Sequence, residues 1–326
     1  MNESVQLLGI SNAIVDILAH VDDDFLEQIG APRGSMTLID ESRAIEIYKM
    51  MGPATEMSGG SVANTIAGFA DLGGSAAYIG KVRDDQLGEI FAHDMRSLGV
   101  DIRLEPAKSG SPTARSHVLI GSDGQRTMQT YLGACTELAF ADVNTKTVAT
   151  PRAILLEGYL WDIPEGPQLC DEAMRIAKTN GTAVALSLSD SFCVERHRDA
   201  YMNAVKSSVD IIFADEDEMS ALFETESFDE ALQKLGDFDN LFVMTRSENG
   251  SVIVKGEQTI VHPATRVEKV IDSTGAGDAF TAGFLYGWTS DESLEECARL
   301  GTFCATNVIQ QIGARMEENL ISRYTS

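Results

Sequence analysis

The sequence predicts an α/β protein whose core is a doubly wound, mostly parallel sheet with helices on both faces, accompanied by a small β lid. Short apolar, β-rich runs alternate with helical stretches through most of the 326 residues, which is typical of a parallel sheet covered by helices. A few other segments alternate apolar and polar residues, as half-exposed strands do. The chain is 44% apolar and 23% charged, which is ordinary for a soluble globular protein and excludes disorder.

The alternation of short apolar runs and helical stretches gives the elements of the main sheet in chain order. We expect buried strands at residues 5–10, 76–79, 153–156, 183–188, 209–213 and 241–245. Helices are expected at residues 61–72, 87–98, 168–178 and 198–205. No Pro/Gly/Ser-rich linker or internal repeat divides the chain. We therefore interpret residues 1–326 as a single α/β domain.

Three segments depart from this rhythm and predict the lid. They lie at about residues 12–20, 33–40 and 113–131, and a Ser-Asp-Gly turn at 122–124 joins two apolar-polar runs of the last. Such a turn between alternating runs indicates a β-hairpin. Because the pieces come from separated parts of the chain, we expect a lid inserted into the α/β body.

The charge of the chain limits its partners. Fifty Asp and Glu against 25 Lys and Arg leave a net charge of -25, which repels nucleic acids and anionic membranes. The five cysteines form no C-x-x-C pair, so we expect reduced thiols without a disulfide framework or zinc site. The N-terminal residues have no basic leader and no apolar run is long enough to span a membrane, so we expect a cytoplasmic protein. Both a monomer and a homodimer remain open.

The strongest motif is IDSTGAGDAFTAGF at residues 271–284. We expect a strand containing Val267 and Val270 to lead into a glycine-rich loop and then a helix. A helix N-terminus, with its unpaired N–H groups and partial positive charge, can hold a phosphoryl group during transfer. Asp278, in the first helical turn, can accept the proton of an attacking hydroxyl. The alternative is a tight turn in which Asp278 is merely a first-turn acid.

A second motif, SGGSVANTIAGFADLGG at residues 58–74, places a glycine pair before a helix. Gly59 and Gly60 allow a ligand to approach the backbone closely. Asn64 can both donate and accept hydrogen bonds, which suits a sugar hydroxyl. Taken alone, such a pair is more often only a helix cap.

Two polar residues near the N-terminus complete the candidate site. Asn12 and Asp16 have an even spacing, which would place both side chains on one face of a strand. A carboxylate in this place could hold two vicinal hydroxyls. The alternative is a pair of exposed polar positions on a lid strand.

Several other enzyme classes lack support in the sequence. There is no G-x-x-x-x-G-K-[ST] loop and no G-x-G-x-x-G after the first strand, so neither a P-loop nor a dinucleotide-binding enzyme is indicated. The five histidines show no ligand spacing. A catalytic zinc or a Ser-His-Asp hydrolase is therefore not expected.

Together, the Gly-Gly…Asn segment near residue 60 and the Asp-Ser-Thr-Gly-Ala-Gly-Asp segment ending at Asp278 resemble the two signatures of the ribokinase-like family of sugar and nucleoside kinases. The resemblance covers nearly the whole chain. It implies a ribokinase-like fold and transfer of the γ-phosphoryl group of ATP, with Mg²⁺, to a primary hydroxyl of a small molecule. It leaves open a monovalent cation such as K⁺ near Asp272.

Within this family the chain is most similar to adenosine kinases, on residues 8–17, 186–192 and 209–213. This similarity implies phosphorylation of the 5′-hydroxyl of adenosine to AMP, a step of purine salvage. The implied catalytic residues are Asp278 as base, Gly275, Ala276 and Gly277 as anion hole, and Arg126 as a lid arginine near the transferring phosphate. The implied substrate-binding residues are Asn12, Asp16, Gly59, Gly60, Ser61 and Asn64 at the ribose, with Met128, Leu132, Tyr159, Trp161 and Phe192 around the purine.

The resemblance also implies an ATP side, where the chain departs from the family pattern. The implied ATP-binding residues are Asp215, Glu218, Thr245, Ser247, Gly250, Thr274, Gly275, Gly277 and Thr302. Asp215 stands where the family commonly has Asn, and with Glu218 it would hold Mg²⁺ through water. An ionised carboxylate cannot donate a hydrogen bond, so metal dependence is open. The alternatives are a ribose or fructose kinase, a kinase of another nucleoside, and a non-catalytic ligand-binding homologue.

Overall fold

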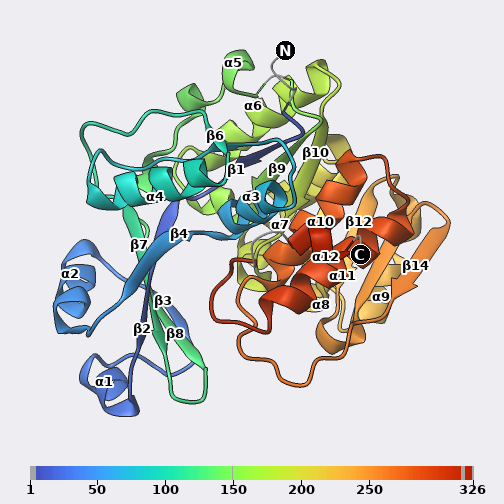
Figure 1. Cartoon of the computed structure of the whole chain (residues 1–326). Coiled ribbons are helices and arrows are strands. Elements are labelled where there is room, and N and C mark those ends of the chain that lie inside the picture. The colour runs from blue at the N-terminus through green and yellow to red at the C-terminus, as the bar shows by residue number, and fades with distance from the viewer. Residues whose placement is uncertain (1–4, 149, 317–319, 325–326) are drawn as a thin grey trace.

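The chain folds into a large sheet flanked by helices and a smaller sheet beside it (Figure 1). The computed structural model describes residues 5–148, 150–316 and 320–324. The strands are β1 (Leu7–Ile10), β2 (Ile14–His20), β3 (Met36–Leu38), β4 (Thr55–Gly59), β5 (Ala76–Ile79), β6 (Asp101–Ile102), β7 (Ala114–Ile120), β8 (Arg126–Tyr131), β9 (Ala153–Glu157), β10 (Ala183–Ser187), β11 (Ile211–Asp215), β12 (Leu241–Thr245), β13 (Ser251–Lys255) and β14 (Gln258–His262).

The α-helices are α1 (Asp23–Gln28), α2 (Glu41–Met50), α3 (Ser61–Asp71), α4 (Gln86–Ser97), α5 (Thr145–Val148), α6 (Gly166–Thr179), α7 (Ser191–Ser207), α8 (Glu216–Phe223), α9 (Phe228–Gln233), α10 (Ala276–Thr289), α11 (Leu294–Val308) and α12 (Leu320–Tyr324). Short 3₁₀ turns are η1 (Gly133–Glu137), η2 (Phe140–Asp142), η3 (Gly158–Asp162), η4 (Leu235–Asp237) and η5 (Ser247–Asn249). Across the described ranges, no helix combines the length and apolar character needed to cross a membrane. The N-terminal residues 1–4, used above to argue against a leader, lie outside the described residues.

The large sheet confirms the predicted α/β class. Within the described residues its order is β14-β13-β12-β11-β10-β9-β1-β5-β6; the pairs β12–β13 and β13–β14 at one edge are antiparallel and the other pairs are parallel. All six strands expected for this sheet are present, and β5 and β12 have the expected bounds. Strands β6, β13 and β14 were not predicted. The expected strand around residues 267–270 is absent: its two valines are separated by two charged residues, and both line a pocket instead.

Both faces of the large sheet are covered by helices, as the alternation of side chains along a strand requires. Leu8 and Ile10 of β1 lie in the core on the side of α6, α7 and α8. Leu7 lies in the core on the side of α3, α4, α10 and α11. Both cores consist of buried aliphatic and aromatic side chains, so the sheet and its helices form a rigid base for the loops at the strand ends.

The smaller sheet is the predicted lid, with the order β3-β8-β7-β2-β4. Its pieces correspond to the three expected segments plus β4, whose short sequence TEMSG is too polar to indicate a strand and which pairs antiparallel with β2. Leu26, Ile47 and Leu119 pack together where α1 and α2 cover one side of the lid. Asn12 precedes the first residue of β2, so it does not share a strand face with Asp16, contrary to the sequence expectation.

The order of the large sheet reverses at β1. From this strand the chain goes to β5 on one side and later to β9 on the other. In open α/β sheets, ligands bind at the carboxyl ends of strands beside such a reversal. Asn12 follows β1 at this point, and Glu157 ends β9.

Candidate active site

The glycine-rich loop before α10 has the geometry of an anion-binding site. Gly275 caps the helix with φ +75°, a left-handed conformation that favours glycine, and a Cβ there would overlap Ala314. The first N–H groups of an α-helix have no intrahelical acceptor and carry partial positive charge. The loop therefore presents the N-terminus of α10, including Gly277, to the space in front of it.

Asp278 lies in the first turn of α10 and is held by two side chains of α3. Ser61 Oγ donates to Asp278 Oδ1 at 2.7 Å, and Asn64 Nδ2 donates to Oδ2 at 3.1 Å. The two sequence motifs, separated by more than two hundred residues, thus meet at one carboxylate. Burial raises the pKa of Asp278 to about 6, against the lowering effect of Ser61, Asn64 and the Arg315 charge. At neutral pH the carboxylate is mainly ionised and able to accept a proton.

The Gly59–Gly60 pair brings Asp16 of the lid close to this carboxylate. A Cβ on Gly59 would overlap the Asp16 carboxyl, and Gly60 has φ +95° with the main-chain oxygen of Asn12 beside it. Burial raises the pKa of Asp16 to about 6; the charges of Arg315 and Arg126 lower it, and that of Asp278 raises it. Asp16 and Asp278 are therefore neighbours in one cleft.

Glu157, which the sequence analysis did not single out, connects the segment after β1 to the start of α3. Its carboxylate accepts from Asn12 N at 3.3 Å and from Val62 N at 3.1 Å. Burial raises its pKa to about 7. An acidic residue ending the apolar strand β9 was the available signal, since buried carboxylates require partners.

Arg126, the expected lid arginine, lies at the start of β8 and forms an ion pair with Asp272. Asp272 Oδ1 also accepts from Thr274 N at 3.0 Å, and Oδ2 accepts from Gly313 N at 2.9 Å. The lid arginine is therefore in contact with the strand-to-loop segment that precedes the anion-binding glycines.

A pocket of about 1010 Å³ opens on the other side of the glycine loop. Its lining includes six of the residues expected on the ATP side, Asp215, Thr245, Ser247, Gly250, Gly277 and Thr302, together with Ala276 of the expected anion hole. The expected Glu218 and Gly275 are not among its lining residues. Thr274 lies next to this lining, with its N–H on Asp272. Residues 263–267, Val270 and Ile309 also line the pocket and were not predicted as ATP-side residues. The pocket has apolar walls and ends at the N-terminus of α10, which fits a nucleotide with its phosphates toward Gly277.

Asp215 and Glu218 form a reciprocal cap at the start of α8. Asp215 Oδ1 accepts from Glu218 N at 2.8 Å, and Glu218 Oε2 accepts from Asp215 N at 2.9 Å. Glu218 is buried, so the pair is not part of a solvated acidic surface. Burial and the Asp215 charge raise the pKa of Glu218 to about 8. Carboxylate oxygens are hard donors of the kind that Mg²⁺ prefers.

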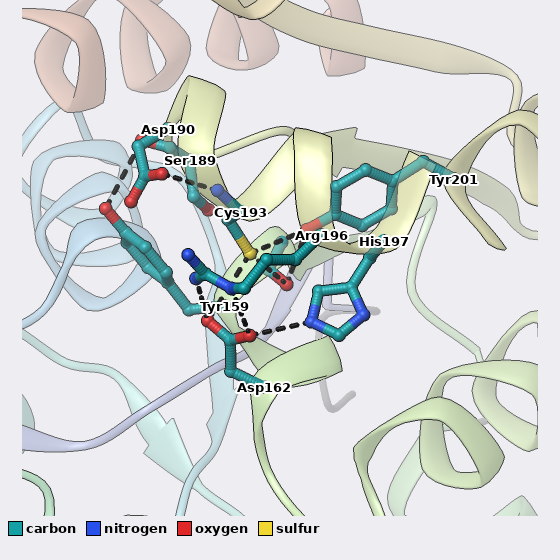
Figure 2. Close-up of polar contacts among 9 residues, drawn as sticks. Tyr159, Asp162, Ser189, Asp190, Cys193, Arg196, His197 and Tyr201 are labelled. Carbon is teal, nitrogen blue, oxygen red and sulfur yellow. Dashed lines mark hydrogen bonds and ion pairs between the residues drawn. The ribbon is translucent and has the colours of Figure 1, made fainter. Parts of the chain in front are cut away.

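The residues expected around a purine do not all line a surface. Phe192 is 70% exposed at the start of α7, and Tyr159 is half-buried, with its hydroxyl donating to Ser189 O at 3.5 Å (Figure 2). Met128 within β8 and Leu132 just after it are partly exposed. Trp161 is instead 5% exposed in the core, edge-on to Tyr201. Four of the five side chains are thus at least partly exposed, and Trp161 is not.

A polar cluster joins η3 to α7 next to Tyr159 (Figure 2). Asp162 accepts from the guanidinium of Arg196 and from His197 Nε2 at 2.6 Å, where α7 departs from helical geometry. Asp162, Cys193 and His197 offer ligand atoms within 4.8 Å of one another. However, Arg196 already neutralises the carboxylate, and burial raises the pKa of the Cys193 thiol to about 12. We interpret the cluster as a structural tie between η3 and α7 rather than a metal site.

Comparisons with known proteins agree with this geometry. Residues 51–319 match the pfkB family of carbohydrate kinases. The crystal structure of adenosine kinase from Sinorhizobium meliloti superposes with a TM-score of 0.92 and 50% identity over 99% of both chains. A probable sugar kinase from Rhizobium etli has a TM-score of 0.92 and 45% identity, covering 99% of this chain and 98% of the other. Adenosine kinase 2 of Arabidopsis thaliana is 26% identical over 96% of each chain.

Proposed function

The chain belongs to the pfkB family of carbohydrate kinases, and we propose that it transfers the γ-phosphoryl group of ATP to the 5′-hydroxyl of adenosine, forming AMP and ADP. The observation that carries the choice of adenosine is the 50% identity, over nearly the full length, with the adenosine kinase of S. meliloti. The contact of Ser61 and Asn64 with Asp278 supports the chemistry, because it holds a base in front of a helix N-terminus.

The reaction requires positioning and charge stabilisation more than covalent chemistry by the protein. In our proposal the 5′-hydroxyl gives its proton to Asp278 while its oxygen attacks the γ-phosphorus, and the bond to the bridging oxygen of ADP breaks. The N–H groups at Gly275–Gly277 stabilise the charge on the transferring group. Arg126 adds a positive charge from the lid side, and the closed lid excludes water that would otherwise hydrolyse ATP.

The acceptor nucleoside would lie between the lid and the end of β1. Asp16 would accept hydrogen bonds from the ribose hydroxyls, with Asn12, Gly60 and Asn64 around the same sugar. Asn12 Oδ1 supports this assignment, because it is buried and has no hydrogen-bond donor among the described residues. Tyr159, Phe192, Met128 and Leu132 would surround the purine, where aromatic and thioether groups favour a planar base.

ATP would occupy the pocket beside Thr245, Gly250 and Thr302, with Mg²⁺ near Asp215 and Glu218. Bound Mg²⁺ would neutralise the phosphate charge. The oxygen donors of Asp215 and Glu218 fit this hydrated ion, as described above. The monovalent cation expected near Asp272 stays a prediction: Asp272 Oδ1 accepts from Thr274 N, and Oδ2 is taken by Arg126 and Gly313 N.

A kinase of a free sugar is the second candidate, because the R. etli protein with 45% identity is a probable sugar kinase. A non-catalytic homologue is less well supported, since a ligand sensor would not need the base Asp278 and its two hydrogen-bond donors.

The test is phosphoryl transfer from ATP with Mg²⁺ to a panel of adenosine, inosine, guanosine, ribose and fructose, followed by detection of the phosphorylated product. We expect the highest kcat/KM with adenosine. A preference for a free sugar would replace the first candidate by the second. Absence of transfer to every acceptor would contradict both and support the non-catalytic alternative.

A further inference from the structure

Arg315 lies where the C-terminal segment meets both halves of the cleft. Its Nη2 donates to the main-chain oxygen of Ser58 at 2.6 Å and also to the Ser58 hydroxyl. Ser58 immediately precedes Gly59, against which the Asp16 carboxyl packs. The neighbouring residue Ala314 packs against Gly275 so closely that no Cβ would fit there. Arg315 therefore joins lid strand β4 to the anion-binding loop.

The charges around Arg315 are mainly negative. Asp94 of α4 lies 4.0 Å from Nη2 and itself accepts from Ser58 N at 2.9 Å. Asp71 of α3, Asp16 of β2 and Asp278 of α10 also interact electrostatically with the guanidinium. The nearby cation Arg126, on β8, is already paired with Asp272. Arg315 is thus the positive charge that Asp16 and Asp278 have in common.

The guanidinium of Arg315 also lacks part of its hydrogen bonds. The Arg315 side chain is 18% exposed, and its Nη1 is buried without an acceptor among the described residues. Buried polar groups in native proteins are normally paired, and exceptions call for an explanation. A tie to Ser58 alone would not require a permanent charge. A role that depends on the charge itself explains both the residue type and its position.

We propose that Arg315 is a positioning residue of the reaction centre: it seats the Ser58–Gly60 turn against the anion-binding loop and is the shared counter-ion of Asp16 and Asp278. Two carboxylates that face one cleft repel each other, and each is easier to protonate when the other is ionised. A protonated Asp278 cannot accept the hydroxyl proton. By its charge, Arg315 keeps both carboxylates ionised at neutral pH. The proposal rests on the kinase function proposed above.

The first test compares three variants of the full chain in the adenosine assay. Arg315→Gln removes the charge, and Arg315→Lys keeps it. Arg103→Gln is the matched control, because Arg103 is 14% exposed, pairs with Asp101 and donates to Thr147 O at 2.7 Å, away from the cleft.

We expect the acidic limb of the kcat/KM profile of Arg315→Gln to lie about one pH unit higher than that of the parent. The reason is that the loss of one nearby positive charge raises the pKa of a carboxylate by about that amount. At pH 7 this shift should lower kcat/KM by about two- to threefold, with recovery above pH 8. The profiles of Arg315→Lys and Arg103→Gln should keep the limb of the parent. A lower rate with an unmoved limb would reduce Arg315 to a structural tie and overturn the proposal.

The second test needs no substrate. The folded-state pKa values of Asp16 and Asp278 are raised to about 6 from 3.8, so the stability they contribute is lost as pH rises through this value. Without the Arg315 charge, the two carboxylates should lose more stability as pH rises. The difference in Tm between the parent and Arg315→Gln should widen from pH 5 to pH 8, and should narrow again when Asp16→Asn and Asp278→Asn are added. A Tm difference that is constant with pH overturns the counter-ion role. If the parent phosphorylates nothing, the proposed function fails, while this comparison still decides the role of Arg315.

Discussion

Arg126, the first residue of lid strand β8, forms a buried ion pair with Asp272, which precedes the anion-binding loop. The two side chains are 9% and 5% exposed, so water screens their attraction little. Asp272 is also an acceptor for two backbone N–H groups of the loop region. The lid is therefore connected to the phosphate end of the cleft by a charge pair, and a phosphoryl group arriving there would meet Arg126 already in place.

Removal of the Asp272 charge should destabilise the protein. In Asp272→Asn the guanidinium of Arg126 stays buried without its counter-ion, and breaking a buried pair in this way costs about 3 kcal/mol. Urea unfolding of parent and variant measures the difference. Asp291→Asn, at the exposed pair with Arg152, is the control and should have little effect. Equal small effects at both sites would contradict a buried, stabilising pair.

Asp278→Asn tests the base. The amide cannot take the hydroxyl proton, so kcat should fall by about 10²- to 10⁴-fold. ATP binding should be retained, because Asp278 is not part of the ATP-side pocket. The matched control is Asp229→Asn, which changes an ordinary first-turn acid, that of α9. Turnover of Asp278→Asn within a few fold of the parent would favour the alternative that Asp278 is also only a first-turn acid.

Local patterns in the sequence were sufficient to predict much of the fold. The strands of the large sheet are continuous apolar runs, and the two glycine motifs are turns that precede helices. Both can be recognised from neighbouring residues. The same logic was wrong at Val267 and Val270, where two apolar residues separated by two charged ones form no strand. Strand β4 was not predicted, because TEMSG becomes a strand only through its pairing with β2.

The candidate site was only partly predictable because its contacts are long-range. The glycines and Asp278 stand in recognisable motifs, yet the hydrogen bond from Ser61 joins residues 217 positions apart. Glu157 and Arg315 have no motif around them, and their places in the cleft depend on which strands and segments become neighbours. The roles of Asp215 and Glu218 were implied by the family resemblance, whereas their backbone contacts make them a helix cap as well.

The activity of the parent enzyme should have an unusually high acidic limit for a carboxylate base. Burial raises the pKa of Asp278 to about 6 from 3.8, so its ionised, proton-accepting form is lost as pH falls through about 6. Below this pH, kcat/KM should fall about tenfold per unit. Enzyme returned from pH 5 to pH 7.5 should regain full activity, which distinguishes titration from denaturation. A profile that stays flat down to pH 5 would show that Asp278 does not control the rate.

Asp215→Asn tests whether this carboxylate has a role beyond the cap of α8. Asparagine is an equally good N-cap, so the helix should remain while one negative charge near the proposed Mg²⁺ is removed. The Mg²⁺ concentration that gives half the maximal rate should then change more than the KM of adenosine. Asp22→Asn makes the same substitution at the N-cap of α1 on the lid and should leave the titration unchanged. Superimposable Mg²⁺ titrations for parent and Asp215→Asn would leave Asp215 with the capping role alone.

The substrate is tested most sharply by the hydroxyls that Asp16 would hold. A carboxylate that accepts from two vicinal hydroxyls loses one hydrogen bond when the acceptor is 2′-deoxyadenosine, and a buried group is left partly unpaired. The resulting discrimination in kcat/KM should be about 1–3 kcal/mol, roughly 5- to 150-fold in favour of adenosine. In Asp16→Ala the carboxylate is gone, so adenosine should become a poorer substrate and the discrimination between the two nucleosides should largely disappear. Asp123→Ala, on the exposed turn of the β7–β8 hairpin of the same lid, should keep the discrimination of the parent. If Asp16→Ala retains both the rate with adenosine and the preference over the deoxynucleoside, then Asp16 does not hold the ribose, and its burial beside Gly59 needs another explanation.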